Sequence, residues 1–209
     1  MITTDKVFLK FNSNFYTLYD INLEILTGEK VVILGESESG KSTLLKVLVG
    51  LIKPTSGNVC VNGTVLNGVI KNTPTLFIPE SSVFFNNATA FKNLKWAIKQ
   101  LSSTKQFDII QILQEYGILE LKDIKVKLLS EYQKFLLSVA RGMLKSPEIV
   151  VIDDTIKKFN EKEINEVVEL LQKIAKNKDI TMIIATSNLE FAKKLGYKTI
   201  KINLGSIQN

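Results

Sequence analysis

One short stretch of the chain has the residue types and spacing of a phosphate-binding loop. Residues 35–43 read Gly-Glu-Ser-Glu-Ser-Gly-Lys-Ser-Thr and lie between the apolar run 31–34 and an apolar, helix-like run that begins at Leu44. A loop of the pattern G-x-x-x-x-G-K-[ST] that closes on a helix N-terminus directs backbone N–H groups and the positive end of the helix dipole at one anion. We expect Lys41 to reach the β- and γ-phosphates of a nucleotide, and Ser42 to offer its hydroxyl to Mg²⁺. The alternative is a glycine- and serine-rich turn that only joins a strand to a helix.

The candidate nucleotide-binding residues are those of the loop itself: Gly35, Glu36, Ser37, Glu38, Ser39, Gly40, Lys41, Ser42 and Thr43. The two glycines let the backbone bend and approach the nucleotide without a Cβ in the way. A phosphate loop alone leaves the reaction open, so further motifs are needed.

A second motif is an apolar run followed by two acids. Residues 149–152 read Ile-Val-Val-Ile, and Asp153 and Asp154 follow, which resembles a Walker B strand. A buried strand would hold Asp153 beside Mg²⁺, directly or through water, with Asp154 facing the γ-phosphate. The alternative is a buried strand that ends in solvated acids, and the phosphate loop upstream favours the functional interpretation.

Composition indicates a globular domain. The chain has 209 residues, of which 45% are hydrophobic and 23% charged, so disordered, collagen-like and membrane-embedded classes do not fit. No apolar run approaches the roughly 20 residues of a membrane-spanning helix, and residues 1–12 lack the apolar core of a signal peptide. A cytosolic protein is therefore expected. Cys60 is the single cysteine and histidine is absent, which excludes an intrachain disulfide and disfavours a zinc site.

The net charge of +6 would suit a nucleic acid or an anionic lipid as a partner. However, lysines are scattered among acids along helix-like stretches such as 157–178, and no aromatic residues interleave with a basic stripe. We therefore favour a solvated, mildly basic surface and expect no nucleic-acid partner.

Periodicity predicts alternating strands and helices. Strands are expected at 6–11, 18–25, 30–34, 58–61 (with a hairpin turn at Asn62-Gly63), 75–78, 149–152, 180–185 and 199–203, and helices at 41–51, 88–101, 107–116, 130–144, 161–176 and 189–195. Strands that alternate with helices around a phosphate loop indicate an α/β fold with a mostly parallel sheet and its site at the carboxyl ends of the strands.

The ordered set of motifs resembles the ATP-binding cassette (ABC) ATPases that power membrane transporters, over nearly the whole chain. Residues 19–25 followed by Gly28-Glu29 are similar to that family's N-terminal strands. The sequence Leu-Ser-Glu-Tyr-Gln at 129–133 looks like its signature motif. Phe77-Ile78-Pro79-Glu80 falls where the family has its Q-loop, and Ala185-Thr186-Ser187-Asn188 where it has a switch histidine.

The resemblance implies a single nucleotide-binding domain over 1–209. Its fold would be an α/β P-loop NTPase with a mostly parallel core sheet, an N-terminal antiparallel β subdomain and an α-helical subdomain inserted at about 84–145. It further implies ATP and Mg²⁺ as cofactors, a homo- or heterodimer with a second nucleotide-binding domain, and a membrane-spanning transporter subunit or domain as partner at the cytoplasmic face of a membrane.

Two groups of aromatic residues carry further expectations from the resemblance. Phe11, Phe15 and Tyr16 are candidates for stacking on adenine, with Phe11 preferred by position; the alternative is that Phe11 is a strand-end core residue. The aromatics Phe84, Phe85 and Phe91 lie where the family docks a short helix of its membrane partner, and the alternative is their burial under the helices.

Five departures from the family pattern fall at positions used for chemistry. Glu38 stands where the phosphate loop usually has glycine, which puts a carboxylate near the phosphates. The candidate signature residues are Ser130, Glu131, Tyr132 and Gln133, and the resemblance implies that they contact the nucleotide bound by the partner subunit. Two glycines of the family pattern are replaced here by Glu131 and Tyr132. A carboxylate and a phenol there should weaken that contact.

The other three departures lie at the hydrolytic centre. Asp154 replaces the expected glutamate with a shorter carboxylate, and Ser187 replaces the switch histidine. Glu80 replaces the Q-loop glutamine; it keeps an oxygen for Mg²⁺ and joins Ser42 and Asp153 as an expected metal ligand. The D-loop at 156–160 also differs from the family pattern. Asp154, Lys41 and Ser187 form the expected catalytic set.

These residues predict Mg-ATP binding with slow hydrolysis, in an ATP-binding subunit or domain that drives or regulates transport. The alternative is a catalytically degenerate regulatory module that binds ATP. A soluble, nucleic-acid-linked member of the fold is a third class, with little support from a single cassette that has no basic tract.

Overall fold

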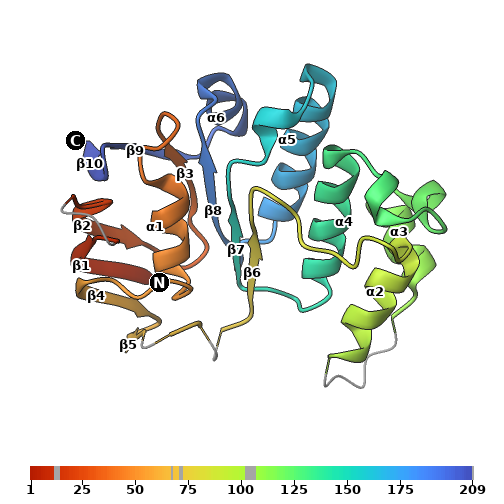
Figure 1. Cartoon of the computed structure of the whole chain (residues 1–209), viewed down its shortest axis with the longest axis horizontal. Helices are drawn as coiled ribbons and strands as arrows, with labels where there is room; N and C mark the ends of the chain where they lie inside the picture. The colour runs from red at the N-terminus through yellow and green to blue at the C-terminus, as the bar shows by residue number, and fades with distance from the viewer. Residues whose placement is uncertain (12–14, 67, 71–72, 102–106, 209) are drawn as a thin grey trace.

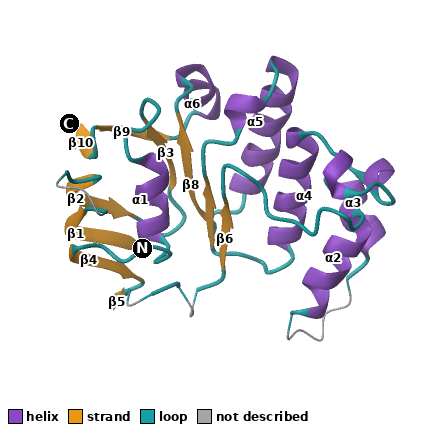
Figure 2. Cartoon of the chain, in the orientation of Figure 1, coloured by secondary structure: helices purple, strands orange, loops and turns teal. Residues whose placement is uncertain are grey.

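The computed structural model describes residues 1–11, 15–66, 68–70, 73–101 and 107–208, which form two sheets flanked by helices (Figures 1 and 2). The first sheet is antiparallel, in the order β2-β1-β4-β5, with β1 Ile2–Leu9, β2 Leu18–Ile25, β4 Ser56–Val61 and β5 Thr64–Val65. The second has the order β10-β9-β3-β8-β7-β6, with β3 Lys30–Leu34, β6 Thr75–Ile78, β7 Ile149–Ile152, β8 Thr181–Thr186, β9 Lys198–Asn203 and β10 Ser206–Gln208. The second sheet is parallel except for β10, which pairs antiparallel with β9.

The parallel sheet forms because its central strands are continuous apolar runs. Every residue of β7 and β8 is buried, as expected for strands that are covered on both faces. One face packs with helix α1 (Lys41–Leu48) and the first sheet, and the other with the helices α4 (Glu131–Met143), α5 (Glu161–Ala175) and α6 (Leu189–Leu195). Two apolar cores on opposite faces therefore fix the sheet.

The chain between β6 and β7 carries helices, as the sequence predicts. Helix α2 (Ala90–Lys99), helix α3 (Ile109–Glu115) and α4 lie there, with the short 3₁₀ turns η1 (Leu119–Leu121) and η2 (Val126–Leu128). In Figure 1, α2 and α3 lie at the far end of the molecule from β1 and β2. None of the helices in the described part of the chain combines the length and apolar composition needed to cross a membrane.

Strand register brings four connecting segments to one edge of the parallel sheet. Leu34 pairs with Thr186, and Ile152 pairs with both Ile78 and Ile184. The residues that follow β3, β6, β7 and β8 therefore leave the sheet together, which places the phosphate loop, Glu80, Asp153-Asp154 and Ser187 at the same edge.

The structure departs from the sequence predictions mainly at element ends. β1 spans Ile2–Leu9 instead of 6–11, because a register shift between Thr4 and Val7 and a left-handed backbone at Lys6 (φ 45°) interrupt the alternation. Helix α1 ends at Leu48, three residues earlier than predicted. β10 was not predicted; it follows a tight turn at Leu204-Gly205, whose φ angles are 44° and 75°. The predicted turn at Asn62-Gly63 does join β4 to β5, with φ angles of 50° and 78°.

Candidate nucleotide-binding site

The phosphate loop joins β3 to α1 with its backbone held close to neighbouring chain segments. Gly40 caps α1 in a left-handed conformation (φ 99°) and provides no side-chain cap. A Cβ at Gly40 would lie 3.1 Å from the carbonyl oxygen of Thr17, and one at Gly35 would overlap the carbonyl oxygen of Ile202. Packing therefore excludes a side chain at Gly35, and the left-handed turn favours glycine at Gly40. The N–H groups at the start of α1 have no side-chain cap to compete with an anion.

Lys41 is folded back over its own loop. The side chain is 5% exposed, and its Nζ donates to the carbonyl oxygens of Gly35 at 2.9 Å and Glu36 at 2.6 Å. Burial lowers the pKa of Lys41, an effect that the nearby carboxylates of Asp154 and Asp153 partly offset. Its two hydrogen-bond acceptors are neutral carbonyls, which phosphate oxygens could replace, and the Asp154 carboxylate lies 3.9 Å from Nζ.

Ser42 and Asp153 come together although they are distant in sequence. The Ser42 hydroxyl donates to Asp153 Oδ1 at 2.7 Å, and the same oxygen accepts the Asp154 N–H at 2.9 Å. A hydroxyl and a carboxylate at this separation are the oxygen ligands that suit Mg²⁺. Within the described residues no group of three or more Asp, Glu, Cys or His could hold a metal ion by itself, so nucleotide oxygens would have to complete the coordination.

Asp154 is buried and only partly satisfied. One oxygen, Oδ2, accepts the Ser187 hydroxyl at 2.9 Å and lies 3.9 Å from Lys41 Nζ. The other, Oδ1, is buried and accepts no hydrogen bond from any described residue. A buried carboxylate oxygen without a donor is costly, by about 1–3 kcal/mol or more, so a donor is expected there when the site is in use.

Glu80 follows β6 and is held by a residue that the sequence did not single out. Lys157 Nζ lies 2.6 Å from Glu80 Oε1. The ion pair lowers the pKa of Glu80 and raises that of Lys157. Lys157 lies on the 3₁₀ turn η3 (Ile156–Lys158), directly after the two acids. Glu80 is therefore at the predicted edge of the sheet, with a lysine as its partner.

The signature residues are bonded among themselves and to their neighbours. Ser130 caps α4 in a capping box with Gln133, through bonds of 3.1 Å and 2.9 Å. Glu131 Oε1 accepts from Lys134 Nζ at 2.8 Å, and Glu131 Oε2 lies 3.9 Å from Lys158 Nζ. The contact with Lys134 is the main cause of the lowered pKa of Glu131. The start of α4 thus carries a carboxylate that already has cationic partners.

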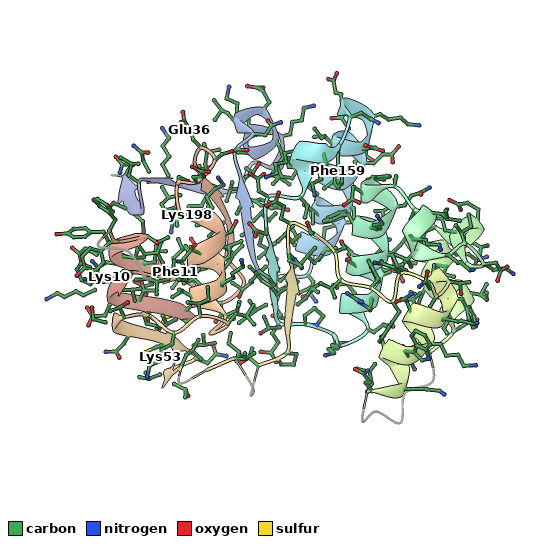
Figure 3. All side chains as sticks on the ribbon, viewed as in Figure 1. Lys10, Phe11, Glu36, Lys53, Phe159 and Lys198 are labelled. Carbon is green, nitrogen blue, oxygen red and sulfur yellow. The ribbon has the colours of Figure 1, made fainter. Side chains whose placement is uncertain are left out.

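Tyr132 turns toward α5. Its hydroxyl donates to Glu166 Oε2 at 2.5 Å, and its ring packs edge-on against Phe159 at 5.6 Å between centroids. Burial and the Glu166 carboxylate raise the pKa of the phenol. Figure 3 shows Phe159 beside α4 and α5, on the same side of the molecule as Glu36 of the phosphate loop. The bulky residue at the second lost glycine is accommodated by packing onto α5.

Glu38 is exposed and has a left-handed backbone, with φ of 64°. This conformation suits glycine and costs other residues roughly 1–2 kcal/mol. The substitution at this position is therefore strained, in addition to placing a carboxylate on the phosphate loop.

The N-terminal aromatics lie at the surface. Phe11 is 52% exposed and lies beyond the end of β1, so the expectation that it could be a strand-end core residue is wrong. Phe15 and Tyr16 are also exposed. Tyr16 packs with Phe8 and Tyr19 in a cluster with centroid separations of 5.1–5.7 Å, a grouping that the sequence did not indicate. An exposed Phe11 remains available to stack on a base.

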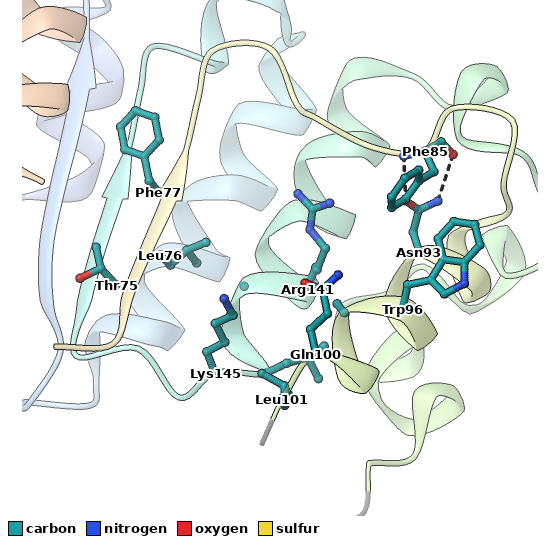
Figure 4. A pocket seen from close by; sticks show the side chains of 13 residues that line it. Thr75, Leu76, Phe77, Phe85, Asn93, Trp96, Gln100, Leu101, Arg141 and Lys145 are labelled. Atoms are coloured by element: carbon teal, nitrogen blue, oxygen red, sulfur yellow. Dashed lines mark hydrogen bonds between the residues drawn. The ribbon is translucent and has the colours of Figure 1, made fainter. Parts of the chain in front are cut away.

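A separate groove of about 310 Å³ lies between β6, α2 and α4 (Figure 4). Phe85 is 62% exposed and packs edge-on against Trp96, with 4.6 Å between the ring centroids. The Phe85 N–H donates to Asn93 Oδ1, and Asn93 Nδ2 donates to the Phe85 carbonyl. Phe84 is partly buried, with the Arg141 guanidinium 4.3 Å from its ring centroid. Phe85 is exposed at the groove, as docking of a partner would need, whereas Phe84 packs against the core, as the alternative expected.

Comparisons with known proteins agree with this geometry. A family model described as ABC transporter matches residues 18–157. The glutamine transport ATP-binding protein GlnQ of Bacillus subtilis is 32% identical over 220 residues, covering 99% of this chain and 88% of the relative. The tyrosine transport ATP-binding protein of Clostridioides difficile is 29% identical, with 90% and 81% covered. A dimeric ATP-binding cassette solved in a post-hydrolysis state with ADP and phosphate has the same fold, with a TM-score of 0.87 at 22% identity and 100% and 97% of the two chains covered. The chain therefore belongs to the ABC transporter family, as an ATP-binding cassette of the P-loop ATPase type.

Proposed function

We propose that this cassette is the ATP-binding subunit of a membrane importer, and that it holds Mg-ATP firmly but hydrolyses it slowly. The bond of 2.7 Å between Ser42 and Asp153, beside Lys41 and the uncapped start of α1, carries the binding half of the proposal. The relatives named for glutamine and tyrosine transport support the transport role. A related sequence is named as a methionine import ATP-binding protein, which supports import as the direction of transport.

The proposal assigns a role to each residue of the site. Lys41 would leave the two loop carbonyls to bind the β- and γ-phosphates, while Ser42 and Asp153 would hold Mg²⁺. When bound, Mg²⁺ neutralises charge on the phosphate oxygens. Asp154 would orient the attacking water through Oδ1, the oxygen that has no donor among the described residues. Ser187 donates to the other oxygen of Asp154 and offers a hydroxyl where the resemblance to the family leads us to expect an imidazole.

Slow hydrolysis is expected because the water-positioning groups are altered or already bonded. Asp154 Oδ2 accepts the Ser187 hydroxyl and lies 3.9 Å from Lys41 Nζ, and Glu80 is paired with Lys157. In a head-to-tail dimer, Glu131 would meet the terminal phosphate bound by the other subunit, where a carboxylate repels it. A regulatory module that binds ATP without significant turnover is the second candidate, favoured by the same bonds.

The binding step is tested by calorimetric titration of ATP with Mg²⁺ and with EDTA. Wild-type protein should bind ATP more tightly when Mg²⁺ is present. Ser42→Ala should remove most of that gain, about tenfold in affinity, and leave binding in EDTA unchanged, because only the metal contact is lost. Absence of saturable binding, or an equal loss in EDTA, would contradict the proposal.

The groove of Figure 4 is the proposed docking site for a helix of the membrane subunit. Phe85→Ala removes the exposed ring that packs on Trp96 and should weaken copurification with a membrane protein while ATP binding is unchanged. Leu204→Ala, at an 83% exposed position on the β9–β10 turn, is the matched control. Equal copurification of the Phe85 variant and wild type would exclude this face.

A further inference from the structure

Two adjacent lysines follow the acids of the site and reach different carboxylates. Lys157 and Lys158 both lie on η3, close behind Asp153 and Asp154. Lys157 Nζ lies 2.6 Å from Glu80 Oε1, while Lys158 Nζ lies 3.9 Å from Glu131 Oε2. The first contact is a close, direct ion pair and the second is a loose one.

The Glu80–Lys157 pair lies next to the expected metal ligands. The Asp153 N–H donates to the Ile78 carbonyl at 2.9 Å, which fixes the end of β6, two residues before Glu80, against the start of the Asp153 segment. The charges of Lys157 and Glu80 both act on the pKa of Lys41, and the Asp154 and Asp153 carboxylates help to raise the pKa of Lys157. The charged groups of the site and this ion pair therefore form one cluster.

The Lys157 ammonium, 2.6 Å from Glu80 Oε1, neutralises the Glu80 carboxylate and occupies part of its acceptor capacity, so it competes with a small, hard cation for Glu80. Mg²⁺ requires near-ideal geometry and oxygen ligands at about 2.0–2.1 Å. The side chains of Lys157 and Glu80 are 42% and 38% exposed, so the pair is hydrated and can open at modest cost. The ion pair would therefore weaken ligation of Mg²⁺ by Glu80 without preventing it.

We propose that Lys157 is a positioning residue that pairs with Glu80 and competes with Mg²⁺ for that carboxylate, so that opening of the Glu80–Lys157 ion pair strengthens Mg-nucleotide binding. The inference rests on the proposed function, because it assumes that a nucleotide and Mg²⁺ bind at this edge of the sheet. Lys157, which lies in the D-loop segment that differs from the family pattern, would thereby act at the site of its own subunit.

The test uses a fluorescent ATP analogue and measures the ratio of its affinities with saturating Mg²⁺ and with EDTA. Lys157→Met should increase this ratio about two- to fivefold, the scale of one partly exposed ion pair. Lys158→Met makes the same change of charge one residue away and should leave the ratio unchanged. In a Glu80→Gln background, Lys157→Met should have no further effect, because its partner is gone.

Each alternative result has a defined meaning. An equal increase in the Lys158 variant, or an increase that persists in the Glu80→Gln background, would show a general charge effect and overturn the inference. Saturable binding with the same ratio in wild type and Lys157→Met would overturn the inference and leave the proposed function intact. Failure of wild-type protein to bind the analogue under any condition would overturn the proposed function itself.

Discussion

The two halves of the candidate site differ in what their charged groups contact. In the phosphate half, Lys41 donates to neutral backbone carbonyls and Ser42 to Asp153. In the hydrolytic and signature half, Glu80 and Glu131 each pair with lysines. A phosphate can replace the carbonyl partners of Lys41 directly, whereas Glu80 and Glu131 can act on a nucleotide only in competition with their lysines.

The difference also follows the departures from the family pattern. The phosphate half keeps its lysine, serine and aspartate, whereas the second half carries Glu80, Glu131, Tyr132, Asp154 and Ser187 in place of the expected residues. Each substituted residue has acquired a partner inside the chain, such as Glu166 for Tyr132. Substitution and internal bonding together support the proposal that this cassette retains its nucleotide and cleaves it slowly.

The largest effect is expected from Lys41→Met, which removes the cation of the phosphate half. ATP affinity should fall about tenfold to hundredfold, because hydrogen bonds from a charged donor contribute about 1.5–3 kcal/mol. Titration calorimetry measures this loss. Lys53→Met, at an exposed lysine after α1, should bind like wild type. Equal affinity of the Lys41 variant and wild type would mean that the loop does not hold phosphate.

Restoring the second half should change turnover and spare binding. The double variant Asp154→Glu and Ser187→His supplies the longer carboxylate and the imidazole, and should raise phosphate release at least about tenfold with ATP affinity within about twofold of wild type. Ser187→Ala, which only removes the bond to Asp154, is the control and should not raise the rate. An unchanged rate in the double variant would place the defect elsewhere, with Glu131 and Tyr132 as the next positions to test.

Glu38→Gly tests the one departure inside the phosphate half. Relief of the left-handed strain at φ 64° should stabilise the protein by about 1 kcal/mol, seen as a higher melting temperature. Loss of the carboxylate should also tighten ATP binding modestly. Glu36→Ala removes the same charge without the strain, and should tighten binding without raising the melting temperature. A lower melting temperature for Glu38→Gly would contradict the strain argument.

The smallest effect concerns stability and pH. Lys157→Met should destabilise the protein at pH 7 by less than about 1 kcal/mol, because the pair with Glu80 is partly exposed. The pKa of Glu80 lies below its ordinary value of 4.5, so this contribution is present above pH 4.5 and is lost as the pH falls through the lowered pKa. Denaturant melts of wild type and Lys157→Met across pH 3–7 should therefore give free energies of unfolding that converge at the acid end. A difference that stays constant over this range would mean that a group other than Glu80 causes it.

Sequence patterns predicted the parts of the fold that have strong local signals. The strands at 30–34, 75–78 and 149–152 match the structure to the residue because each is an apolar run bounded by glycine, proline or acid. β1 was misplaced because its bulge breaks the alternation, and β10 depends on a turn at Leu204-Gly205 with only a weak sequence signal. Local periodicity cannot report such irregular backbone.

For the site, motif order predicted which segments meet but not what their side chains bond. The phosphate loop and the acids after β7 lie together as parallel strand register requires. The pairing of Glu80 with Lys157 and of Tyr132 with Glu166 depends on packing between distant segments, so no local pattern indicates it. These unpredicted bonds are what distinguish the two halves.

The most direct test of this distinction is to measure ATP affinity and steady-state phosphate release on the same preparation in Mg²⁺. We expect saturable binding in the micromolar range, together with turnover of about 0.01 s⁻¹ or less, well below the roughly 1–10³ s⁻¹ of typical enzymes. Turnover of about 1 s⁻¹ or more that Asp154→Asn abolishes would show that the hydrolytic half is competent and would contradict the account.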